Sequence, residues 1–139
     1  LISYNGRCFD IPFIESYFNL RLGCAQIDLR YVLARLGFKG GLKGCEAALG
    51  IDRGGLAGVD GFMAVLLWRL YRKTGQKAAL ETLLAYNIED VINLESLMVK
   101  AVNLNLEKRP FPGTAPIPGP RLPANPFTPD AAVLTALGL

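Results

Sequence analysis

The 139-residue sequence predicts a mostly helical α/β chain with one or two strands. The apolar segment Leu1–Tyr4 has the character of a buried strand, and Asn5-Gly6 is a turn signal that leads into a helix. Farther along, apolar residues recur at helical spacing through most of residues 60–105. A strand followed at once by a turn and a helix is typical of α/β folds, and we assign the chain to that class.

The first helix is expected to begin at Asp10, a good N-cap, and to run to about Leu20. Pro12 fits its first turn. The apolar side of this helix comprises Phe13, Ile14, Tyr17 and Phe18. A short second strand is expected within Cys24–Leu29, with Asp28 near its end as a structural cap rather than a metal contact.

Five more helical stretches are expected, the last two nearly continuous: Tyr31–Leu36, Leu42–Leu49, Asp60–Thr74, Lys77–Ala85 and Asn87–Asn105. Eight of the nine prolines lie after residue 109, so Arg109–Pro129 is expected to be an extended linker. Ala131–Leu139 is a short apolar end that can dock or stay loose. We therefore predict one domain over residues 1–105 and a proline-rich tail over 106–139.

Composition excludes several kinds of chemistry. Histidine is absent, which removes Ser-His-Asp triads, histidine-based zinc sites and histidine general bases. Cys8, Cys24 and Cys45 are too widely spaced for a metal motif, so reduced thiols in a cytoplasmic protein are expected. The longest apolar run, Phe62–Trp68, is far shorter than the roughly 20 residues of a membrane helix. The net charge of +3 is compatible with nucleic acid without arguing for it.

Two acidic motifs are candidates for chemistry. Asp10 directly follows the first strand, which would place it at the carboxyl end of the sheet, where α/β sites gather; spacing alone favours a helix cap. Tyr86 and Asp90 are four residues apart and share a helix face, whereas Glu89 points about 100° away and is expected to be a surface charge. The alternative for this pair is a half-buried core tyrosine beside a solvated aspartate.

In full, the two motifs are Asn5-Gly6-Arg7-Cys8-Phe9-Asp10 and Tyr86-Asn87-Ile88-Glu89-Asp90. Together they resemble the second and third motifs of the ribonuclease-H-like 3′–5′ exonucleases (DnaQ-like, tyrosine-type DEDD group). The stretches Gly41–Ile51 and Asp60–Tyr71 are similar to the YprB-type branch, and the resemblance covers about residues 1–104. It implies a ribonuclease-H-like fold and metal-dependent hydrolysis of DNA or RNA with Mg²⁺ or Mn²⁺. Asp10 and Asp90 would be metal ligands, and Tyr86 would orient the attacking water.

The same resemblance implies an Asp-x-Glu motif on an earlier strand, and this sequence does not contain one. Leu1 is not methionine, and Leu1–Tyr4 already has the character of the inside of a sheet. We therefore expect an incomplete ribonuclease-H-like fold that lacks its N-terminal strands and is inactive alone. An exposed sheet edge is expected to promote self-association.

Contacts to nucleic acid are expected at Asn5 and Gly6, which would shape the turn near the substrate, and at Lys43 and Arg53, on or beside glycine-rich loops. The remaining basic residues of the loops and helices are expected to be solvated charges: Lys39, Arg69, Arg72 and Lys73. Trp68 and Tyr71 are expected to pack in the core. Two alternatives to the exonuclease stay open: a non-catalytic nucleic-acid-binding or interaction scaffold with a nuclease-like fold, and a purely structural helical module.

Overall fold

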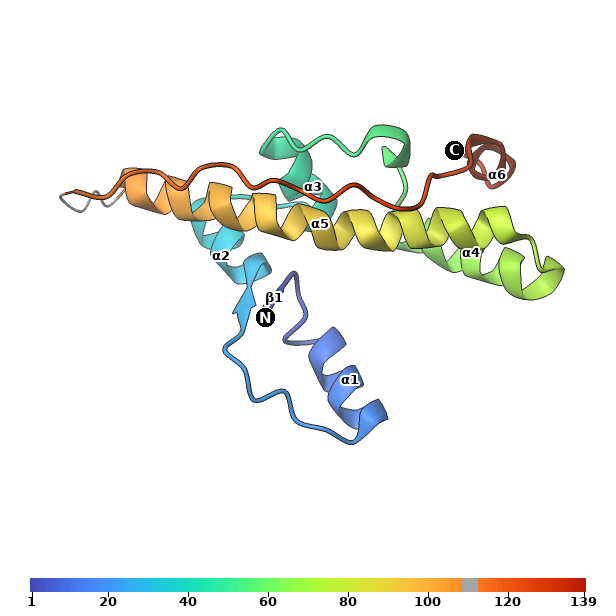
Figure 1. Cartoon of the computed structure of the whole chain (residues 1–139), viewed down its shortest axis with the longest axis horizontal. Helices are drawn as coiled ribbons and strands as arrows, with labels where there is room; N and C mark the ends of the chain where they lie inside the picture. Colours follow the sequence, from blue (N-terminus) through green and yellow to red (C-terminus); the bar gives the residue numbers. More distant parts are fainter. Residues whose placement is uncertain (109–112) are drawn as a thin grey trace. The chain divides into compact units, whose positions relative to one another are not determined.

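The computed structural model describes residues 1–108 and 113–139 (Figure 1). The chain divides into two compact units, each with its own apolar core. Unit 1 comprises Leu1–Ile51 and Asn93–Arg121, and unit 2 comprises Asp52–Ile92 and Leu122–Leu139. Residues 109–112 of the expected linker lie outside the described residues. Along the described parts, no helix has both the length and the apolar character needed to cross a bilayer.

Unit 1 contains a small parallel sheet and several helices: β1 (Ile2–Ser3), α1 (Asp10–Phe18), β2 (Ile27–Asp28), α2 (Leu29–Leu36), α3 (Gly41–Ala48) and the C-terminal part of α5 (Lys77–Lys108). Ile2 pairs with Ile27 and Ser3 with Asp28. Both expected strands therefore exist, although each is only two residues long, and the mostly helical α/β prediction agrees with the structure. In the described residues the two strands pair only with each other; self-association through the sheet edge stays a prediction.

The core of unit 1 is formed where α2, α3 and α5 pack together. Its buried members are Leu29, Leu33, Cys45, Leu97 and Ala101. A polar pair is buried with them: the side-chain amide of Asn93 donates a hydrogen bond of 3.0 Å to Oε1 of Glu46, and these residues are 2% and 0% exposed. Because a buried carboxylate is costly unless it is hydrogen-bonded, this contact ties α3 to α5.

Unit 2 is built from a 3₁₀ turn (η1, Gly54–Leu56), α4 (Gly61–Thr74), the N-terminal part of α5 and α6 (Ala131–Ala136). The expected cap of α4 is confirmed, because Oδ1 of Asp60 accepts a 2.9 Å hydrogen bond from the Met63 N–H. Gly75 ends α4 in the left-handed region at φ 70°. Met63 and Leu67 are the buried residues of this helix.

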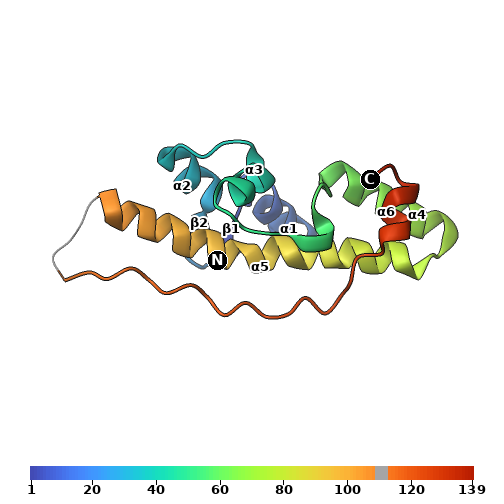
Figure 2. The same cartoon turned by 90° about the horizontal axis from the view of Figure 1, so that it is seen from above.

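The two helical stretches expected after residue 76 form one helix, α5, of 32 residues. Figures 1 and 2 show it as unbroken. No glycine or proline occurs between Lys77 and Lys108, so nothing in the sequence interrupts the backbone hydrogen bonds.

The C-terminal end docks instead of staying loose. Val133 and Leu134 of α6 are buried in the core of unit 2. The Asp130 N–H donates to Oγ1 of Thr82 at 2.9 Å, and Asn125 donates to the Ala85 carbonyl at 2.8 Å. Both apolar packing and hydrogen bonds to α5 therefore anchor this segment.

Helix α1 departs from two expectations. Its N-cap is Phe9 and no side chain caps it, so Asp10 is the first helical residue rather than the cap. The backbone turn meets this need, since the Ile11 N–H donates to the Gly6 carbonyl at 2.9 Å. The apolar side of the helix is also exposed, at 66% for Phe13 and 73% for Tyr17, and only Ile11 is buried.

Trp68 also differs from expectation. It is 44% exposed, and the guanidinium of Arg72 lies 5.7 Å from the centre of its ring, whereas Tyr71 packs against the core of unit 2. Helical spacing placed both rings on one side, but only Tyr71 lies where α4 meets its neighbours.

Replacing Leu67 with alanine should lower the free energy of unfolding by about 2–5 kcal/mol, because a fully buried side chain leaves a cavity. Val65→Ala is the matched control on the same helix, since Val65 is 44% exposed and its loss should change stability by less than about 0.5 kcal/mol. Urea unfolding followed by circular dichroism measures both. Equal effects of the two substitutions would contradict the described core.

Candidate functional site

The first motif of unit 1 is a turn held by one carboxylate. Oδ1 of Asp28 accepts hydrogen bonds from the Asn5 N–H at 2.7 Å and the Arg30 N–H at 3.1 Å, and Oδ2 accepts one from the Arg7 N–H at 3.2 Å. Asp28 is thus the N-cap of α2 and the anchor of the turn, which confirms the structural role expected for it. Asn5 lies in the left-handed region at φ 63°, a conformation that asparagine tolerates better than most residues.

Gly6 and Asp10 lie close together in this turn. A Cβ atom at Gly6 would lie 2.5 Å from Cβ and Oγ of Ser3, so only glycine fits, and it would lie 3.6 Å from Oδ2 of Asp10. The Asp10 carboxylate therefore lies beside the turn at the start of α1. The positive end of the helix dipole favours a negative charge there.

The second motif forms a cluster in unit 2. Nη2 of Arg53 lies 2.6 Å from Oδ1 of Asp90, and the two side chains are only 8% and 23% exposed. The guanidinium also lies 5.6 Å from the centre of the Tyr86 ring. The loop before η1 therefore brings a cation to the face of α5 that carries the tyrosine and the aspartate.

Tyr86 is held in its neutral form. Burial, followed by the charge of Asp90, raises the pKa of Tyr86 to about 12, while the Arg53 guanidinium opposes the shift. The phenol also hydrogen-bonds to the Asp90 carboxylate. At neutral pH it is a hydrogen-bond donor rather than a proton acceptor.

Lys43 belongs to unit 1, on α3, where its Nζ lies 4.0 Å from Oε2 of Glu46. The structure thus gathers Asn5, Gly6 and Asp10 in one unit, and Arg53, Tyr86 and Asp90 in the other. Glu89 is half-buried and accepts a hydrogen bond from Asn125 at 3.3 Å, so it is less exposed than expected.

Sequence reasoning missed the Arg53–Asp90 pair and the buried Glu46–Asn93 contact. A partner 37 or 47 residues away leaves no local spacing signal. A glutamate among small residues and an asparagine inside a helix both look like ordinary surface positions in the sequence.

The metals implied by the resemblance can be tested against these side chains. A two-metal centre gathers several carboxylates with open positions for water. Among residues 1–108 and 113–139, no group of three or more acidic or thiol side chains could hold a metal ion. Asp90 is also engaged by a guanidinium. The described residues therefore do not fit a two-metal centre by themselves.

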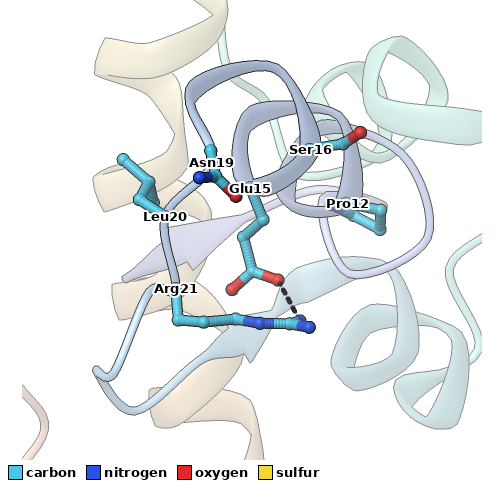
Figure 3. A pocket seen from close by; sticks show the side chains of 6 residues that line it. All are labelled: Pro12, Glu15, Ser16, Asn19, Leu20 and Arg21. Carbon is cyan, nitrogen blue, oxygen red and sulfur yellow. Dashed lines mark hydrogen bonds and ion pairs between the residues drawn. The ribbon is translucent and has the colours of Figure 1, made fainter.

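A cavity of about 500 Å³ lies at the C-terminal end of α1 (Figure 3). Figure 3 shows Glu15 and Arg21 pointing toward one another across it, joined by a 3.1 Å ion pair. Glu15 also accepts a hydrogen bond from the Leu22 N–H at 2.9 Å. These contacts hold the segment that follows α1 against the end of the helix. None of the candidate site residues lines this cavity.

Titration of Tyr86 tests the cluster without any substrate. The phenolate absorbance that is lost in Tyr86→Phe should develop only near pH 12 in the unmodified chain. Asp90→Asn should lower the pKa of Tyr86, because it removes a neighbouring negative charge, and Arg53→Gln should raise it. Shifts of the opposite sign would show that the three side chains are not together.

Comparison with known proteins identifies a superfamily for this sequence. A family model described as RNase_H superfamily matches residues 1–102, which include both motifs. No curated protein and no solved structure gave a match. A match to this superfamily suggests a nuclease-like function and a nucleic-acid substrate. Nucleases of this superfamily generally use divalent metal ions. The chain belongs to the RNase H superfamily.

Proposed function

We propose that this chain forms part of a 3′–5′ exonuclease that hydrolyses nucleic-acid phosphodiester bonds. The observation that carries the proposal is the half-buried cluster of Arg53, Tyr86 and Asp90 inside the segment that matches the superfamily. A carboxylate, a neutral phenol and a guanidinium supply an acceptor, a donor and a positive charge at one place.

Each side chain has a role in hydrolysis of a phosphodiester. The Asp90 carboxylate accepts a hydrogen bond from the attacking water. The Tyr86 phenol, which stays protonated and donates its proton to Asp90, accepts a hydrogen bond from this water through its oxygen and so helps to orient it. Arg53 holds Asp90 in place and puts a positive charge next to the phosphate as negative charge develops on it.

The assignment of Asp10 and Asp90 to Mg²⁺ or Mn²⁺, and of the chain to the YprB-type branch, rests on the resemblance. The contacts to nucleic acid assigned to Asn5, Gly6 and Lys43 also rest on the sequence analysis. The Asp-x-Glu motif that the resemblance implies would supply the carboxylates that the described residues do not gather. The turn supported by Asp28 holds Asn5 and brings Gly6 close to the Asp10 carboxylate, which is compatible with a metal ligand beside a turn that contacts the substrate.

A non-catalytic nucleic-acid-binding scaffold is the second candidate. The 2.6 Å pair between Arg53 and Asp90 favours it, because the guanidinium engages a carboxylate oxygen that would otherwise be open to a metal ion. Under this alternative the cluster only stabilises unit 2, and strands are bound without cleavage.

Cleavage of a 5′-labelled single strand separates the two candidates. The protein that contains these 139 residues should produce a ladder shortening from the 3′ end when Mn²⁺ is present. Asp90→Asn should slow this ladder by about 10²–10⁴-fold, the range for removing a group that acts on the reacting atoms. Gel electrophoresis of DNA and RNA strands gives the rates.

Glu95→Gln is the control, since Glu95 lies exposed on the same helix and the substitution removes the same charge. It should leave the ladder unchanged. Strands bound but not shortened, with the protein folded, would support the scaffold and overturn the exonuclease.

A further inference from the structure

A second cavity lies in unit 1, beside the turn that carries the first motif. It measures about 390 Å³, which is within the range of small-molecule sites. Its lining residues come from the end of β1, from α2 and from the start of α3: Tyr4, Asn5, Arg30, Ala34, Phe38, Lys39, Gly40 and Gly41. None of them lines the cavity at the end of α1.

The lining is positively charged. Arg30 and Lys39 contribute two cations, and the lining contains no acidic side chain. Within residues 1–108 and 113–139, neither cation forms a salt bridge with a carboxylate. The nearby carboxylate of Asp28 is already satisfied by three backbone N–H groups. An anion entering this cavity therefore meets two positive charges.

Polar and aromatic groups complete the lining. Nη1 of Arg30 donates to Oδ1 of Asn5 at 2.6 Å, which fixes the amide of Asn5 at the cavity. Tyr4 and Phe38 add half-buried rings. The Tyr4 hydroxyl lies 3.7 Å from the Cys45 sulfur, and burial raises the pKa of Tyr4 to about 12, so this ring is uncharged.

We propose that this cavity binds a nucleotide, with its phosphate at Arg30 and Lys39 and its base against Tyr4 and Phe38. Guanidinium and ammonium groups are the usual phosphate partners, and aromatic rings stack on any base. The nucleotide is either one unit of a single strand or a free nucleoside monophosphate. The strand as its source rests on the proposed function, whereas the site itself does not.

Fluorescence anisotropy in EDTA tests the site without cleavage. The probe is a labelled oligothymidylate of about 12 nucleotides, within the roughly 4–16-nucleotide range of single-strand binders. Arg30→Gln with Lys39→Gln should weaken binding at least about tenfold, as expected for losing charge-assisted phosphate contacts. The slope of log K against log salt should fall by about 0.7, for the one phosphate of a single strand that the site holds.

The matched control is Arg35→Gln with Lys108→Gln. These residues line another cavity of unit 1, of about 430 Å³, and their loss changes the net charge equally. This control should change affinity less than about twofold. Lys39→Gln alone should weaken binding while keeping the Arg30–Asn5 hydrogen bond, which guards against a misfolded turn. Circular dichroism checks that every variant is folded.

Competition identifies the source of the nucleotide. Adenosine 5′-monophosphate should displace the labelled strand more effectively than inorganic phosphate, because it also offers a base. Binding of adenosine 5′-monophosphate without binding of the strand would support the site with a free nucleotide as its ligand. Equal losses in the two double variants, or no binding of either probe, would overturn the site.

Failure of this site differs from failure of the proposed function. A cleavage ladder that depends on Asp90, together with unchanged strand binding in the Arg30 and Lys39 variants, overturns the cavity alone. Strand binding that is lost in those variants, with no ladder under any condition, leaves the cavity and removes the exonuclease.

Discussion

The geometry of unit 1 depends on the carboxylate of Asp28. It accepts hydrogen bonds from three backbone N–H groups, two in the turn after β1 and one at the start of α2. A two-residue strand pair offers too few backbone hydrogen bonds to fix that turn. The buried carboxylate therefore does the work that a longer sheet does elsewhere, and it sets where Asn5, Gly6 and Asp10 lie.

Charge balance governs the cluster in unit 2 in a different way. Asp90 and Arg53 are partly buried, and each offsets part of the free-energy penalty that the other incurs on removal from water. This stabilises the fold locally and also weakens Asp90 as a ligand for a cation. In the proposed hydrolysis Asp90 therefore acts while it stays paired with Arg53, whereas in a scaffold the pair only stabilises unit 2.

The sequence predicted features that depend on neighbours along the chain. The cap at Asp60 and the end of α4 at Gly75 follow local hydrogen bonding, and the resemblance identified the superfamily. Prediction from the sequence failed where the burial or pairing of a side chain depends on residues far away in the chain. Helical spacing showed that Phe13 shares a side with other apolar residues, but not whether anything covers that side. The pairing of Arg53 with Asp90 leaves no local pattern either.

The distribution of charge bears on how such a chain could recognise nucleic acid. A net charge of +3 produces only a weak overall field, which is screened within about 10 Å at ordinary ionic strength. Affinity for a strand must then come from cations that lack nearby acidic partners. Arg53 is ion-paired with Asp90, and Lys43 lies near the buried Glu46. Arg30 and Lys39 have no such ion pair among the described residues, so phosphate contact in unit 1 is best supplied at their cavity.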